Sequence, residues 1–117
     1  MRTYTLNVIC DPEVIKEALL ALNLREYSVP LGQNSGEDRA TRVLTVEHTS
    51  TASSLVKALV KISYRVQGRK YWSDLYWIEI KSENNCMIAT VRRISGVGRT
   101  DPDFIIDELL KYIVTRV

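Results

Sequence analysis

His48 is the only histidine of the 117-residue chain, and the residues that follow it are the first candidates for chemistry. The segment EHTSTASSLVKAL (residues 47–59) leads from this histidine into short hydroxyl side chains at a predicted helix start. The first backbone N–H groups of a helix have no intrahelical partner and carry partial positive charge, so they bind anions such as phosphate. A histidine beside a bound phosphate is drawn toward its protonated form, as a general acid requires. The pattern predicts a phosphate site with His48 as its acid; the alternative is an ordinary polar residue at a strand end.

Basic side chains gather in two places that could serve such a site. They are Lys57, Lys61 and Arg65, which recur at every fourth residue, and Arg92, Arg93 and Arg99, which lie in one short segment. Either cluster can neutralise phosphate charge, and either can equally be a solvated basic face. The segment YRVQGRKYWSDLYW (residues 64–77) interleaves Arg, Lys, Tyr and Trp, a composition suited to stacking bases and holding phosphates. The alternative for this segment places Trp77 in the core and leaves Tyr71 and Trp72 half-exposed.

The chain lacks the signature motifs of several enzyme classes. The sequence has no G-x-S-x-G elbow, no H-E-x-x-H pair, no Walker loop and no G-x-G-x-x-G fingerprint. The segment SGVGR (residues 95–99) has only two glycines and follows a predicted strand, which favours a plain turn over a phosphate-binding loop. Two cysteines, Cys10 and Cys86, and one histidine do not make a zinc or iron ligand set. We therefore expect neither a metal nor a cofactor.

Composition indicates a single folded domain over residues 1–117. Hydrophobic residues make up 45% of the chain and charged residues 26%, which argues against disorder. A chain of this size buries a modest core, so a homodimer is expected. No apolar run approaches the ~20 residues of a membrane span, and MRTYTLNVIC (residues 1–10) alternates like a strand rather than a signal peptide. We expect an intracellular, cytoplasmic protein without a membrane partner; the net charge of +2 is too small to indicate nucleic acid by itself.

The helices and strands that must position these residues are predicted from hydrophobic periodicity and from the Gly, Pro, Asn and Asp residues that end them. Strands are predicted over residues 3–9, 25–32, 41–48, 74–80 and 86–94, the last two as a hairpin across residues 81–85. Helices are predicted over residues 11–24, 50–66 and 101–117, and a mobile loop over residues 33–40. The central helix would carry an apolar stripe of Leu55, Leu59, Ile62 and Val66. The order β-α-β-β-α-β-β-α predicts an α+β domain with about five strands in a mixed sheet and helices packed on it.

The segment HTSTASSLVKAL (residues 48–59) resembles the His-x-Ser-Thr-x-x-x-Leu-Val-x-x-Leu segment of the viral ring nucleases that inhibit type III CRISPR defence. Those are small proteins of archaeal viruses and phages that destroy cyclic tetra-adenylate, the alarm signal of that defence. Farther along, ATVRRISGVGR (residues 89–99) looks like the family segment that ends in Gln-Arg-Leu-Glu-Glu-Gly-Lys. This places Arg93 opposite the functional arginine of the family, with Arg92 as the alternative one residue away. The chain length and the predicted order of elements are also similar.

The resemblance implies metal-independent cleavage of a cyclic oligoadenylate in the host-cell cytoplasm. The ribose 2′-OH would attack the adjacent phosphate, His48 would protonate the departing 5′-oxygen, and Arg93 or Arg92 would stabilise the developing charge. The ligand-binding residues would be Asp11, Ser50, Thr51, Ser53, Arg92 and Arg99. A homodimer would hold the two-fold-symmetric ring across its interface, as in the family. The loop at residues 34–39 would close over it.

Two positions depart from the family pattern, and they leave two further interpretations open. The glutamate that follows the family arginine has no counterpart before Asp101, and the serine that ends the first strand is replaced by Cys10 or Asp11. A second interpretation is therefore a non-catalytic binder, either a sponge for cyclic nucleotide or a viral DNA- or RNA-binding dimer. A third is an interaction dimer in which Tyr71, Trp72 and Trp77 form the contact.

Overall fold

The computed structural model describes residues 1–6, 11–30, 39–52, 54–66, 69–83, 86–96 and 101–116. These form two helices and six strands, in the order β1 (Arg2–Leu6), α1 (Pro12–Leu22), β2 (Arg25–Pro30), β3 (Arg39–Ala52), β4 (Leu55–Val66), β5 (Arg69–Glu83), β6 (Cys86–Ser95) and α2 (Asp103–Arg116). The predicted α+β class is confirmed. No helix within the described ranges combines the length and the apolar character needed to cross a membrane.

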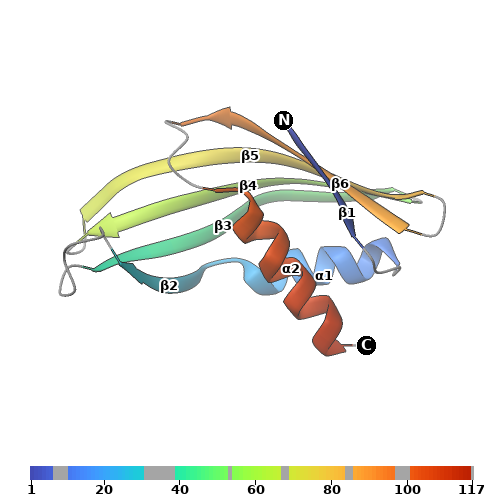
Figure 1. Cartoon of the computed structure of the whole chain (residues 1–117), viewed down its shortest axis with the longest axis horizontal. Helices are drawn as coiled ribbons and strands as arrows, with labels where there is room; N and C mark the ends of the chain where they lie inside the picture. The colour runs from blue at the N-terminus through green and yellow to red at the C-terminus, as the bar shows by residue number, and fades with distance from the viewer. Residues whose placement is uncertain are drawn as a thin grey trace.

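The strands form one curved sheet in the order β1-β6-β5-β4-β3-β2, and every neighbouring pair is antiparallel. The predicted mixed sheet of about five strands is therefore wrong in both respects. Both helices lie on the concave side of the sheet, with α2 crossing in front of it (Figure 1). We call this side the inner face and the opposite side the outer face.

The predicted helix over residues 50–66 is wrong, because this segment forms the end of β3, a turn and the whole of β4. Its apolar residues satisfy a helical period, but burial alternates at every second residue from Leu55 to Ile62. Val56, Val60 and Ile62 are buried on the inner face together with Ala58, whereas Leu59 between them is only half-buried. β-Branched Val and Ile favour the extended backbone. The order of elements is thus β-α-β-β-β-β-β-α.

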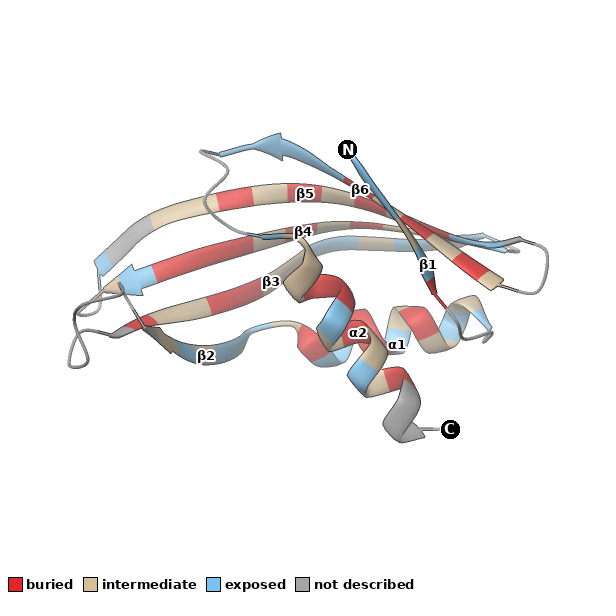
Figure 2. Ribbon diagram, viewed as in Figure 1, coloured by how far each residue is buried: buried red, intermediate tan, exposed pale blue. Residues whose placement is uncertain are grey.

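The two terminal helices agree with the sequence pattern. Helix α1 lies within the predicted range 11–24: it begins at Pro12, follows Asp11 at its N-cap position, and buries Ile15, Leu19 and Leu22. Helix α2 begins at Asp103, whose backbone N–H donates to the Asp101 side chain over 3.0 Å. The predicted hairpin is also confirmed, with β5 and β6 paired on either side of residues 84–85. Figure 2 shows the resulting core, with buried positions alternating along the central strands and lining the sheet side of both helices.

Polar and aromatic contacts attach α2 to the sheet at its N-terminal end. The Arg2 guanidinium donates to Asp101 over 2.8 Å and to Asp103 over 2.9 Å, and the Tyr4 hydroxyl also donates to Asp103. Burial and the Asp103 contact raise the pKa of Tyr4 to about 12. The Tyr4 hydrogen bond and Arg2 lower the pKa of Asp103.

A second attachment lies on the β2–β3 side of the sheet. The Arg42 guanidinium stands 4.4 Å from the centre of the Phe104 ring, and its Nε donates to the Tyr64 hydroxyl over 3.0 Å. Tyr27 packs edge-on against Phe104 and donates to Glu108 over 3.2 Å. The two attachments hold the first turns of α2 across the inner face, so that face is covered whereas the outer face carries neither helix.

Candidate functional site

One row of side chains crosses four adjacent strands on the outer face. His48 on β3 lies opposite Leu59 on β4, Leu59 lies opposite Trp77 on β5, and Trp77 lies opposite Arg92 on β6. Directly paired residues of antiparallel strands project from the same face, with Cβ atoms about 5 Å apart. The strand neighbours of Leu59 and Trp77 are buried on the inner face, which places this outer-face row on the side away from the helices.

The position of His48 depends on a β-bulge. The register between β3 and β4 shifts between Val46 and His48, so that Glu47 is the extra residue. A bulge redirects the side chains around it and is frequent beside functional sites. Glu47 reaches Lys61 on β4, with 3.5 Å between its Oε1 and the lysine Nζ. The bulge thus brings a carboxylate, an ammonium and the exposed imidazole of His48 together on the outer face.

Polar rows flank the outer-face row on both sides. Ser50, Lys57, Glu79 and Thr90 form one, and Thr45, Lys61 and Ser95 form the other, in which the apolar Leu75 lies between Lys61 and Ser95. The Trp77 indole N–H donates to Glu79 Oε1 over 2.9 Å, which fixes the plane of the indole. Beside it lies a pocket of about 160 Å³, lined by Met1, Trp77, Glu79, Thr90 and Arg92. The arrangement offers one aromatic surface with cations on either side.

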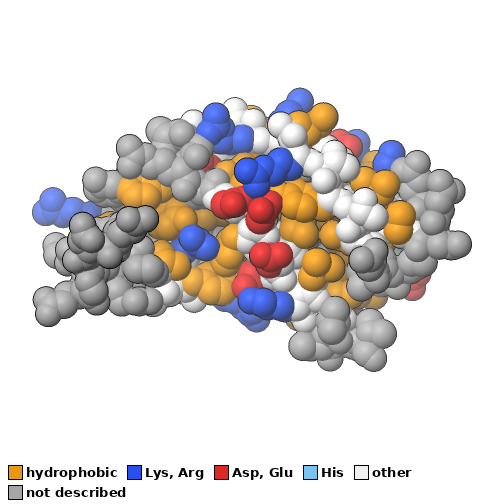
Figure 3. Space-filling view, viewed as in Figure 1, with side chains coloured by type: hydrophobic (Ala, Val, Ile, Leu, Met, Phe, Trp, Pro, Cys, Tyr) orange, Lys and Arg blue, Asp and Glu red, His pale blue; other side chains and the backbone are white. Residues whose placement is uncertain are grey.

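The charge of the two faces differs. Among the described residues, the basic side chains on the outer face are Lys57, Lys61, Arg65, Lys81 and Arg92, against the acidic Glu26, Glu47 and Glu79. On the helix side, acidic side chains gather over α2 in the middle of the view in Figure 3. A polyanion is therefore attracted to the outer face.

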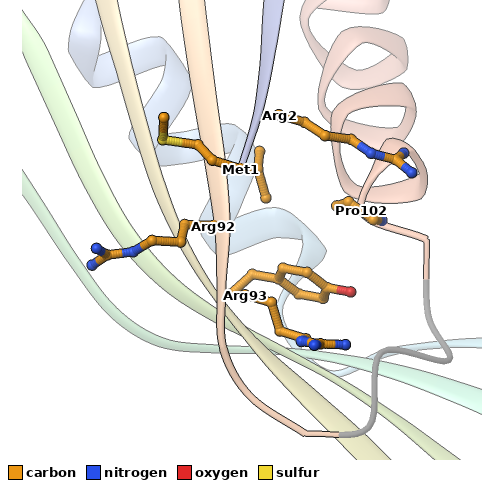
Figure 4. Close-up of a pocket in the computed structure, with 7 residues that line it drawn as sticks. Met1, Arg2, Arg92, Arg93 and Pro102 are labelled. Atoms are coloured by element: carbon orange, nitrogen blue, oxygen red, sulfur yellow. The ribbon is translucent and has the colours of Figure 1, made fainter.

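The structure separates the two predicted catalytic residues. Arg93 pairs with Tyr76, whose side chain is buried on the inner face, so Arg93 projects away from the side that carries His48. Figure 4 shows Arg92 and Arg93 leaving β6 in opposite directions. Arg92 shares the face of His48, at three strand spacings, or about 14 Å between Cα atoms. Of the two arginines, Arg92 is therefore the one that can share an outer-face ligand with His48.

The predicted phosphate-binding helix start does not exist, and its residues are divided between two faces. Ser50 is exposed on the outer face. Thr51 projects to the inner face and donates to Glu13 at the start of α1 over 3.1 Å. A pocket of about 440 Å³ there is lined by Asp11, Pro12, Glu13, Thr51 and Ala52. Its two carboxylates disfavour a phosphate, so Asp11 and Thr51 do not share a phosphate site with His48.

Some predicted residues cannot be placed. Ser53 and Arg99 lie outside the described residues, as does Cys10, and so do the loop residues 34–38. In the part of the chain that is described, no three His, Cys, Asp or Glu side chains come together in a way that could hold a metal ion.

Sequence reasoning named the segment that contains Trp77 as suited to stacking bases, but it missed the outward register of Trp77 and the contributions of Glu79 and Glu47. The segment DLYWIEI alternates, and an outward register for Trp77 follows once Tyr76 and Ile78 are assigned to the core. That signal was available for Trp77 and Glu79. No local sequence signal marks the bulge at Glu47, since its position depends on the pairing of β3 with β4.

Comparison with known proteins adds nothing to these observations. The chain matches no known protein family, no curated protein and no solved structure. The resemblance to viral ring nucleases therefore depends on the short segments around His48 and Arg93 alone.

Proposed function

We propose that this protein binds a single-stranded ligand made of nucleosides joined by phosphodiesters, and that it does so on the outer face of the sheet. The observation that carries the proposal is the outer-face row, in which Trp77 lies between Leu59 and Arg92 and in line with His48. Single-stranded nucleic acid is commonly bound by an aromatic side chain that stacks a base and by cations that track the backbone.

Each part of the row has a distinct role. The half-buried Trp77, whose indole plane is fixed by Glu79, would stack one base. Arg92 on one side and Lys57 on the other would contact the flanking phosphates. Stacking of one base on an aromatic residue contributes about 1–3 kcal/mol, so Trp77 would supply a large share of the affinity.

The more specific proposal is cleavage of cyclic tetra-adenylate, as the resemblance implies. His48 is exposed on the proposed binding face, where its imidazole would protonate the leaving 5′-oxygen. The separation of about 14 Å between His48 and Arg92 means that one chain contacts different phosphates with these two residues. A two-fold dimer that encloses the ring would bring His48 of one chain toward Arg92 of the other, so cleavage would require the homodimer.

Binding is tested by fluorescence anisotropy with labelled linear hexa-adenylate and by competition with cyclic tetra-adenylate. Trp77→Ala should weaken binding of the linear ligand about 5- to 150-fold, the equivalent of 1–3 kcal/mol. Trp72→Phe is the matched control, because Trp72 packs on Tyr64 on the inner face, and it should leave the affinity within about twofold. Binding that is absent, or equal in the Trp77 variant, would refute the proposal.

Cleavage is tested separately with cyclic tetra-adenylate in EDTA. Conversion to a linear product by the wild type, lost in His48→Ala while binding remains, would support the ring nuclease. A ring that stays intact but bound would make the protein a binder alone. Sedimentation at the same concentrations measures whether the active species is a dimer.

A further inference from the structure

We infer that a linear ligand continues from the outer face over the edge of β6 and places a further phosphate against Arg93 on the inner side, an inference that rests on the proposed function. Arg93 would thus be a second phosphate-binding residue, for the same strand, on the opposite face of the sheet. The ligand class is a linear single strand with at least two consecutive phosphodiesters.

The edge of β6 is open where this path would cross it. Strand β1 pairs with β6 only as far as Arg2 opposite Val91. From Arg92 to Ser95, β6 continues along β5 but has no described strand on its other side. A strand of ligand can therefore pass from one face to the other at this point without crossing a paired strand.

Pockets on the two sides of this edge are contiguous. The outer pocket beside Trp77 and a pocket of about 350 Å³ on the inner side share Met1 and Arg92 in their walls. The inner pocket is completed by Arg2, Tyr76, Val91, Arg93 and Pro102. In Figure 4, Arg92 points away from Pro102, while Arg93 lies on the side of Pro102 and α2. Arg92 therefore lines both pockets, whereas Arg93 lines the inner pocket alone.

Charge distinguishes Arg93 from the other arginine in the inner pocket. Arg2 is held by Asp101 and Asp103 at 2.8 and 2.9 Å, so its charge is already compensated. Neither Arg92 nor Arg93 forms an ion pair with any residue in the described part of the chain. Both are exposed. Arg93 is therefore the cation that an incoming phosphate would meet on the inner side.

The same geometry predicts a difference between linear and cyclic ligands. A small closed ring seated on the outer face has no end to pass over the edge, so it would contact Arg92 and not Arg93. A linear oligoadenylate would contact both. The contribution of Arg93 should therefore depend on ligand topology.

The test measures Kd for linear hexa-adenylate and for cyclic tetra-adenylate between 50 and 300 mM NaCl, in the wild type, Arg92→Ala, Arg93→Ala and the control Lys111→Ala. Lys111 is an exposed α2 cation paired with Glu108, so its removal matches the charge change elsewhere on the surface. For the linear ligand, each arginine variant should reduce the slope of log Kd against log salt by about 0.7. For the ring, only Arg92→Ala should weaken binding, and Lys111→Ala should change neither ligand.

The outcomes separate the two proposals. If Arg92→Ala and Trp77→Ala weaken the linear ligand but Arg93→Ala matches the wild type, the path over the edge is wrong and outer-face binding stands. If Arg93→Ala weakens the ring as much as the linear strand, the path over the edge is also wrong. If neither arginine variant nor Trp77→Ala changes binding, the proposed function itself fails.

Discussion

Gly96 fixes the end of the strand that carries Arg92 and Arg93, and its replacement by alanine should strongly destabilise the fold. Its φ of +110° is a conformation that side chains other than that of glycine rarely adopt. A Cβ added there would lie 2.1 Å from Asp74 Oδ1, 2.6 Å from the Ser73 carbonyl oxygen and 2.7 Å from the Asp74 Cα. Two of these three atoms belong to the backbone of β5 and cannot rotate away.

The magnitude follows from two contributions. A residue held at an unfavourable positive φ costs about 1–3 kcal/mol. Displacing the fully buried Asp74 side chain from its packed position costs about 1–3 kcal/mol more. Gly96→Ala should therefore lower the free energy of unfolding by about 4 kcal/mol, a large part of the ~5–15 kcal/mol typical of a small domain.

Urea denaturation followed by circular dichroism measures this change. With a slope of about 1–3 kcal/mol per molar urea, the midpoint should fall by about 2 M. Ser95→Ala, at the exposed neighbouring position, is the control and should leave the midpoint unchanged. A Gly96→Ala protein within 1 kcal/mol of the wild type would show that β6 does not pack against Asp74 in this way.

Three further predictions concern the attachment of α2 and the assignment of β4. The pKa of Tyr4 is about 12 in the folded protein and ~10 in the unfolded chain, so its contribution to folding stability is full below pH ~10 and is lost as the pH rises toward 12. In Tyr4→Phe the urea midpoint should therefore fall less between pH 10 and pH 12 than in the wild type. The pKa of Asp103 is lowered in the folded protein, so its contribution to folding stability is present above the ordinary aspartate pKa of ~3.9 and is lost as the pH falls below that value. In Asp103→Asn the urea midpoint should therefore fall less on acidification than in the wild type. Val60→Ala should cost about 2 kcal/mol and Leu59→Ala less than half of that, since only Val60 is fully buried; the reverse order in urea titrations would favour the helical assignment of this segment.

The sequence was sufficient for the two terminal helices and for the α+β class, but not for β4. The apolar residues of α1 fit only a helical period, and the helix has a proline at its first position, so both signals indicate the same helix. Residues 55–66 fit two periods at once, because lysine or arginine at every fourth position satisfies both a helix and an alternating strand. Pairing with β3 and β5 selects the strand over the helix for residues 55–66. This pairing is a tertiary contact, so the local sequence pattern does not predict it.

The candidate site was predictable in its residue types more than in its arrangement. His48, Arg92 and Lys57 could be chosen from the sequence because imidazole and cations suit phosphate chemistry. Their common face could not, because it depends on the bulge at Glu47 and on the registers of four strands. A shift of one residue in a strand moves every side chain to the other face, which is why Arg92 and Arg93 exchange roles between the sequence-based expectation and the structure.

The pairing of β1 with β6 also sets an order for folding. Strands β2 to β5 each pair with the next strand along the chain, so strands β2 to β6 can assemble through successive antiparallel pairs. Strand β1 instead pairs Leu6 with Met87, which closes a far longer loop at a greater entropic cost. Strand β1 can therefore find its partner last, after strands β2 to β6 have paired. The row from His48 to Arg92 lies entirely on β3 to β6, so the outer face can assemble before the N-terminal strand completes the sheet.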